Sequence, residues 1–113
     1  MSLNLHLIAD PCPHCGRADE VLDFNITHNL NRMAEEAGVY DVLWRPEENG
    51  VKLAVQLVKP LEAAIEMMMA DPSRFQAHDA PNGWGTFEQF LPWLVKVLHA
   101  CRAHPEAEVR AGR

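Results

Sequence analysis

Apolar and polar residues alternate near the start of the chain, and this pattern predicts a half-buried β-strand over residues 3–9. Asp10 and Pro11 end the alternation because proline cannot continue a paired strand. Residues 21–24, Val-Leu-Asp-Phe, predict a second strand that returns beside the first. We therefore expect an N-terminal β-hairpin with residues 12–16 at its tip.

Helical spacing of apolar residues begins after residues 25–29, which contain three small polar residues able to cap a helix N-terminus, Asn25, Thr27 and Asn29. The first predicted helix has its apolar residues at Leu30, Met33, Ala34 and Ala37. Gly38 is expected to end it, because glycine accepts the left-handed conformation that follows many helices. A second short helix is expected over residues 40–44, closed by Pro46.

The longest helical pattern covers residues 51–70, where Pro60 is expected to kink the helix or split it in two. Asp71 and Pro72 should open a short helical turn, and residues 76–85 have the composition of a loop. The apolar stripe of the long helix is predicted to contain Leu53, Leu57, Leu61, Ala64, Ile65, Met68 and Met69.

A last helix is predicted to begin at Thr86, because Thr86 and Gln89 have the spacing of a capping box. It should end at His104, before Pro105. The polar tail is expected either to be loose or to add an edge strand over residues 108–110. The predicted buried face of this helix comprises Phe87, Phe90, Leu91, Leu94, Val97, Leu98 and Cys101.

These elements predict one α+β domain, mostly α, over residues 1–113, a length that suits a single modest core. An N-terminal β-hairpin with a Cys-x-x-Cys knuckle (1–24) should pack on a helical body (25–104) of three to four helices. Residues 105–113 form the tail.

The charge balance excludes one class of partner. Ten basic residues stand against sixteen acidic ones, a net charge of −6, whereas a duplex nucleic-acid binder needs a cationic face. No apolar run of ~18 residues is present, so no membrane-spanning helix is expected. The N-terminus lacks the features of a signal peptide, and three cysteines suit a reducing compartment. We therefore expect a soluble protein in the cytoplasm of the host cell.

Chemistry is concentrated in the run Cys12-Pro13-His14-Cys15-Gly16. This spacing lets one tight turn direct both sulfurs at a zinc ion, and a glycine after the second cysteine allows close backbone approach. A tetrahedral site needs further ligands, and His28 is the preferred one in the sequence. His6, His14, Cys101 and a carboxylate remain alternatives. Two reduced cysteines that hold a turn without metal are the simpler interpretation.

The same Cys-Pro-His-Cys run also has the form of a thiol redox motif, in which a helix N-terminus lowers the pKa of the first thiol. Only one strand precedes the run, and no alternation of strands and helices follows it. Redox chemistry at Cys12 and Cys15 is therefore the lesser alternative.

Polar residues with two tryptophans form a second candidate site. It comprises Asn25, Thr27, His28, Asn29, Trp44, Arg45, Asn82 and Trp84. One interpretation is a pocket floored by the tryptophans that binds a small molecule or peptide. The other assigns the asparagines to caps and turns and the tryptophans to core packing. His28 is a candidate general base, but no serine or second thiol accompanies it in sequence, so enzymatic activity is not expected.

Four motifs together resemble a family of small proteins encoded by bacteriophages and prophages. They are the knuckle at 12–16, Asn-Ile-Thr-His-Asn-Leu at 25–30, Leu-Trp-Arg-Pro-Glu at 43–47 and Pro-Asn-Gly-Trp-Gly-Thr at 81–86. Their order and spacing match along nearly the whole chain. The resemblance implies a phage or mobile-element origin and no catalytic residue.

Taken together, these patterns favour a non-enzymatic, zinc-stabilised accessory protein that binds a host or phage protein, with a homodimer left open. The first alternative is a small-molecule binder or hydrolase built around His28, Asn29, Asn82 and Trp84. The second is a thiol redox protein that uses Cys12 and Cys15.

Overall fold

A computed structural model describes residues 2–9 and 19–112 of the chain. The described part forms an α+β fold that is mostly helical, with three strands and five α-helices. The strands are β1 (Ser2–Ala9), β2 (Asp19–Thr27) and β3 (Glu108–Gly112). The α-helices are α1 (Asn31–Ala37), α2 (Tyr40–Trp44), α3 (Val55–Ala70), α4 (Pro72–Gln76) and α5 (Phe87–Ala103), with short 3-10 helices η1 (His28–Leu30) and η2 (Pro46–Glu48).

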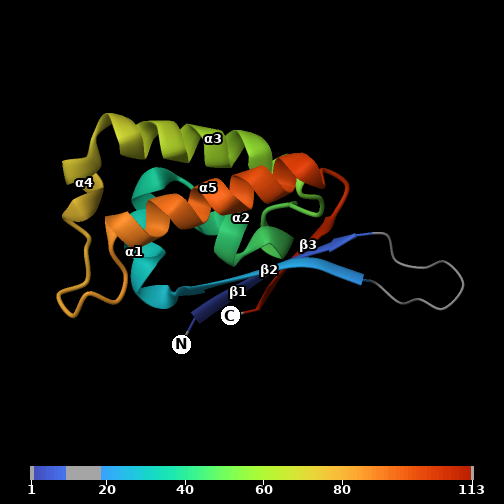
Figure 1. Cartoon of the computed structure of the whole chain (residues 1–113), viewed down its shortest axis with the longest axis horizontal. Coiled ribbons are helices and arrows are strands. Elements are labelled where there is room, and N and C mark those ends of the chain that lie inside the picture. The colour runs from blue at the N-terminus through green and yellow to red at the C-terminus, as the bar shows by residue number, and fades with distance from the viewer. Residues whose placement is uncertain (1, 10–18, 113) are drawn as a thin grey trace, which may run out of the picture.

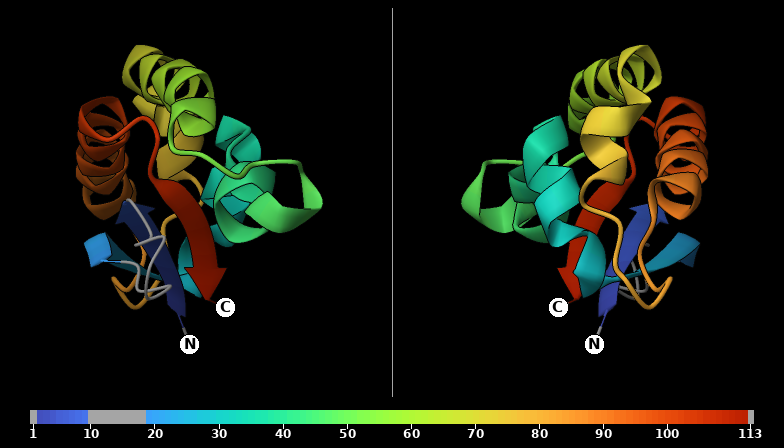
Figure 2. Two further views of the ribbon diagram at one scale, coloured as in Figure 1. Left: turned by 90° about the vertical axis from the view of Figure 1, so that its right-hand side faces the viewer. Right: turned by 90° about the vertical axis from the view of Figure 1, so that its left-hand side faces the viewer.

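The three strands form one antiparallel sheet in the order β2-β1-β3. The alternation along β1 separates two faces, because Leu3, Leu5 and Leu7 are fully buried while their neighbours are half-buried. The helices cover only the apolar face of the sheet (Figures 1 and 2). The two predicted strands of the hairpin are confirmed, although β2 is longer than the strand predicted over residues 21–24. The tail forms an edge strand beside β1 rather than a loose end.

Capping and terminating residues in the sequence predicted the positions of most helices correctly. Helix α1 ends at Gly38, which adopts φ 78°, the left-handed conformation that the glycine permits. Helix α2 occupies the predicted residues. Helix α5 begins after Thr86, and Thr86 and Gln89 make the reciprocal capping box.

The prediction for residues 51–70 was partly wrong. Helix α3 begins only at Val55, and Leu53 pairs with Glu108 as an isolated antiparallel bridge. Pro60 removes one backbone hydrogen bond, but the helix continues through it to Ala70 without splitting. Leu53 and Met69 were expected on the buried stripe, but they are 40% and 65% exposed.

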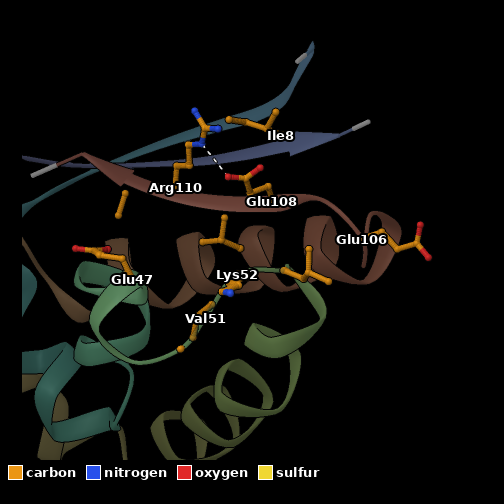
Figure 3. A pocket seen from close by; sticks show the side chains of 11 residues that line it. Ile8, Glu47, Val51, Lys52, Glu106, Glu108 and Arg110 are labelled. Atoms are coloured by element: carbon orange, nitrogen blue, oxygen red, sulfur yellow. Dashed lines mark hydrogen bonds and ion pairs between the residues drawn. The ribbon is translucent and has the colours of Figure 1, made fainter. Parts of the chain in front are cut away.

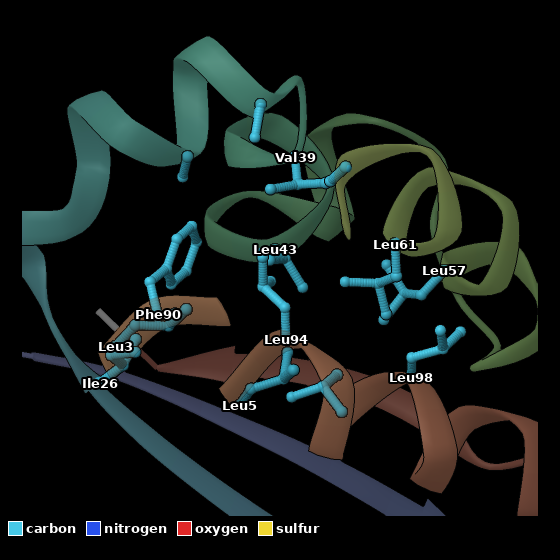
Figure 4. Close-up of a cluster of buried hydrophobic side chains, with 14 of the residues drawn as sticks. Leu3, Leu5, Ile26, Val39, Leu43, Leu57, Leu61, Phe90, Leu94 and Leu98 are labelled. Atoms are coloured by element: carbon cyan, nitrogen blue, oxygen red, sulfur yellow. The ribbon is translucent and has the colours of Figure 1, made fainter. Parts of the chain in front are cut away.

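The core lies between the sheet and the helices, and α3 and α5 pack along each other over it (Figure 1). Figure 4 shows the central side chains, contributed by both layers: Leu3, Leu5, Ile26, Val39, Leu43, Leu57, Leu61, Phe90, Leu94 and Leu98. The body contains five α-helices in the described residues, more than the three to four expected, because α4 is a separate element. Within this described part, no helix combines the length and apolar character needed to cross a bilayer.

Candidate functional site

The Cys-x-x-Cys knuckle at Cys12 and Cys15 lies outside the described residues. The last described pair on its side of the hairpin is Ala9 with Asp19, whereas Thr27 pairs with Ser2 at the other end. The eight residue steps from Asp19 to Thr27 span about 26 Å at a strand rise of about 3.3 Å. His28 directly follows Thr27, at the end of β2 away from Asp19, and its role as a metal ligand stays a prediction.

The other metal candidates do not gather elsewhere in the described residues. Residues 2–9 and 19–112 contain no group of three or more His, Cys, Asp or Glu side chains able to hold a metal ion. Cys101 is fully buried in α5, and burial raises the pKa of its thiol to about 12. Cys101 is therefore a small apolar core residue without thiolate character at neutral pH.

The two tryptophans of the second candidate site occupy different environments. Trp44 is only 2% exposed, and its ring stacks on Tyr40 with centroids 5.5 Å apart. The indole Nε1 of Trp44 donates to His28 Nδ1 at 2.9 Å, which satisfies its buried polar group. The prediction that Trp44 floors a pocket was wrong, because Trp44 belongs to the core and His28 serves as its acceptor.

Three more of the predicted binding residues have local structural roles. Asn25 Nδ2 donates to Ser2 Oγ and Asn4 Oδ1, at 2.9 and 2.6 Å, across the open face of the sheet. Thr27 caps η1, because its hydroxyl accepts from the Asn29 amide at 3.2 Å. Arg45 Nη1 donates to Glu48 Oε2 at 2.8 Å, and this hydrogen bond raises the pKa of the guanidinium, which keeps its charge.

The remaining predicted residues converge at the loop of residues 81–86, here called the Trp84 loop. Asn29 Nδ2 donates to the Trp84 carbonyl oxygen at 2.8 Å, a contact between residues 55 positions apart in sequence. Asn82 Oδ1 accepts from the Trp84 amide at 3.0 Å, which closes an Asx turn. Asn29 and Asn82 therefore fix the backbone on both sides of the same tryptophan.

Two side chains outside the predicted site complete the attachment of this loop. Gln89 Oε1 accepts from the amides of Gly85 and Thr86 at 3.0 and 3.1 Å, while its Nε2 donates to the Gly83 carbonyl at 3.2 Å. Asp79 Oδ1 accepts from the Phe87 amide at 2.7 Å, at the start of α5. The capping-box spacing revealed Gln89 in the sequence, but no local signal revealed its contact with Gly83.

Gly85 brings the loop against the η1 segment. It adopts φ 114°, a conformation that side chains rarely accept, and it is buried. A Cβ at this position would lie 3.0 Å from Asn29 Cβ and 3.3 Å from Thr27 Cγ2. The Trp84 loop can therefore rest on residues 27–30 only because position 85 has no side chain.

The arrangement presents one large apolar side chain on a fixed backbone. Trp84 is 72% exposed, although hydrogen bonds hold its own amide, its carbonyl and both neighbouring glycines. The side-chain amides of Asn29 and Asn82, which were expected to line a pocket, instead hold the backbone of this loop. Comparison with protein-family models, curated proteins and solved structures gives no match for this chain.

Proposed function

We propose that the chain is a non-enzymatic accessory protein, of the kind carried by phages and prophages, that acts by binding a host or phage protein through Trp84. The observation that carries the proposal is the 72% exposure of Trp84 on a loop whose backbone is held by hydrogen bonds from residue 83 to residue 86. Tryptophan is enriched among the residues that dominate protein interfaces. A fixed loop also loses little conformational entropy when a partner binds.

The free energy that burial of Trp84 in an interface would contribute supports a binding role. Burying the exposed part of one tryptophan removes enough apolar surface from water to contribute roughly 3–4 kcal/mol. The net charge of −6 disfavours nucleic acid as the partner and suits a basic protein surface around the tryptophan contact.

Site-specific photocrosslinking tests this proposal. A photoreactive phenylalanine analogue replaces Trp84 in one variant and Met69 in another, because Met69 is 65% exposed but lies on α3. In host cells, we expect a discrete adduct from position 84 and none from position 69. An adduct of twice the chain mass would identify a second copy as the partner. Equal labelling from both positions, or no adduct from position 84, would contradict the proposal.

A structural zinc ion bound by Cys12 and Cys15 is the second part of the proposal, supported by the spacing of the two thiols. Elemental analysis of the native protein should give about one zinc per chain, as expected for a closed site. Cys12→Ser should lose the metal, whereas His28→Ala should retain it because Cys15 precedes Asp19 by only four residues and His28 follows the other end of β2. Loss of zinc in the His28 variant would overturn that ligand assignment.

The two alternatives predict different results. A hydrolase or small-molecule site around His28, Asn29, Asn82 and Trp84 needs free polar groups, yet His28 Nδ1, Asn29 Nδ2 and Asn82 Oδ1 all hold other residues. A thiol redox protein requires both cysteines to be metal-free and exchangeable. Reversible disulfide exchange of Cys12 in a glutathione buffer, without bound metal, would favour redox chemistry over zinc.

A further inference from the structure

A groove of about 800 Å³ runs along the outer edge of β3, and no residue of the Trp84 loop lines it. Residues 50–53 form one side, and β3 from Glu108 to Ala111 forms the other (Figure 3). Ile8, Glu47 and Glu106 complete the lining. The apolar lining residues are Ile8, Val51, Leu53, Val109 and Ala111. Leu53 is 40% exposed, whereas Val51 and Val109 are buried.

The groove begins where a partial strand pairing stops. The Val109 amide donates to the Lys52 carbonyl and the Ala54 amide donates to the Ala107 carbonyl, both at 2.8 Å, around the bridge between Leu53 and Glu108. Residues 52–54 are therefore a short antiparallel neighbour of β3 on the edge away from β1. In a continued ladder, the Lys52 amide would donate back to the Val109 carbonyl.

Gln56 diverts the chain at this point. Its Oε1 accepts from the amides of Lys52 and Leu53 at 2.7 and 2.9 Å, and its Nε2 donates to the Gly50 carbonyl at 3.0 Å. Gly50 adopts φ 72°, which turns the preceding chain away. The segment 50–52 thus leaves β3 before the pairing reaches Ala111.

The edge that remains carries unused backbone groups. Successive residues of a strand direct their amide and carbonyl to opposite edges, so Val109 and Ala111 both face the groove while Arg110 faces β1. In the described parts of the chain, no group outside the β1–β3 ladder bonds to the Val109 carbonyl or to the Ala111 amide and carbonyl. Exposed strand edges of this kind are templates for further pairing.

We propose that this edge binds an extended segment of a partner protein, which adds as a strand beside β3 and continues the pairing that residues 52–54 begin. Main-chain hydrogen bonds to the Val109 carbonyl and to the Ala111 amide and carbonyl hold the segment. An apolar side chain of the segment packs against Leu53. Among the charged lining residues, Arg110 Nε pairs with Glu108 Oε1 at 3.1 Å, and the others are Glu47, Glu106 and Lys52. The lining is therefore net negative, and a segment with basic flanks fits best. This inference depends on the proposed function in one respect, namely that the chain binds other proteins.

Amide NMR of the full chain with a defined peptide tests this inference. The probe is a short acetylated and amidated peptide of alternating Val and Thr with Lys at each end. Its control is the same peptide N-methylated at every Val and Thr, which cannot pair with a strand edge. We expect the unmethylated peptide to shift the Ala111 amide and slow its hydrogen exchange, and the methylated peptide to do neither.

Two variants at one position separate main-chain pairing from side-chain contact. Ala111→Pro removes the amide that faces the groove, and proline is tolerated on an edge where the amide makes no ladder bond. This variant should bind the peptide at least tenfold more weakly, whereas Ala111→Val, which retains the amide, should bind within about threefold of the native chain.

Three results would overturn the inference: no shift at Ala111 with millimolar peptide, equal binding of the methylated peptide, or unchanged binding by Ala111→Pro. The peptide comparison uses the native chain and does not depend on either variant folding. Failure here would leave the crosslinking result at Trp84 unaffected, because the groove and the Trp84 loop share no residue.

Discussion

Replacing Gly85 with alanine should weaken the support of the Trp84 loop more than the same change at Gly83. Both glycines have positive φ, 114° and 78°, so alanine introduces backbone strain of about 1–3 kcal/mol at either position. Only at Gly85 would the new Cβ meet neighbours, at 3.0 Å from Asn29 Cβ and 3.3 Å from Thr27 Cγ2. Overpacking of this kind adds about 1–3 kcal/mol, whereas the Cβ at Gly83 has open space.

We therefore expect Gly85→Ala to lower the free energy of unfolding by about 1–3 kcal/mol more than Gly83→Ala. Urea denaturation followed by far-ultraviolet circular dichroism measures both values, and equal slopes would show that the unfolded states are comparable. The loop should also lose its hydrogen bond from Asn29, visible as faster proton exchange of the Asn29 side-chain amide. Equal destabilisation by the two variants, or a larger loss in Gly83→Ala, would refute the close-approach argument.

Three further predictions follow from burial and capping. Because burial raises the pKa of Cys101 to about 12, a variant that lacks the other two cysteines should react with a thiol reagent at pH 8 only after denaturation. Met68 is fully buried and Met69 is 65% exposed. By urea denaturation, Met68→Ala should therefore lower the free energy of unfolding by about 2–5 kcal/mol, and Met69→Ala should change it by less than about 0.5 kcal/mol. Similar losses in the two variants would contradict the assignment of Met68 to the buried face of α3. Thr86→Ala should lower the free energy of unfolding by about 1 kcal/mol through loss of the cap, and Thr86→Ser should recover most of it.

The helices were predictable where local signals agreed. Gly38 marked the end of α1 through its left-handed conformation, and Thr86 with Gln89 marked the start of α5 through the capping box. The pattern failed for residues 51–54, because Leu53 continues the helical spacing of α3 while its backbone pairs with Glu108. That pairing partner lies 55 positions away, so no local rule contains it.

The candidate site was predictable in its residues but not in their roles. The asparagines at 29 and 82 were recognised as one polar group, and the fold does bring both to Trp84. Their function as supports of an exposed side chain depends on the contact of η1 with the loop before α5. Trp44 and Trp84 are the same residue type within short polar motifs, yet one is 2% exposed and the other 72%.

The sequence by itself determined most elements of this protein and its charge of −6, through the alternation of β1, the helical stripes and the caps. These properties depend on residues within a few positions of one another, where backbone geometry sets the period. Only the tertiary structure decided that β3 joins β1, that the 50–52 segment leaves its edge open, and that Trp84 faces solvent. Each of these results depends on which distant surfaces meet, because burial and strand pairing are set by the packed chain as a whole.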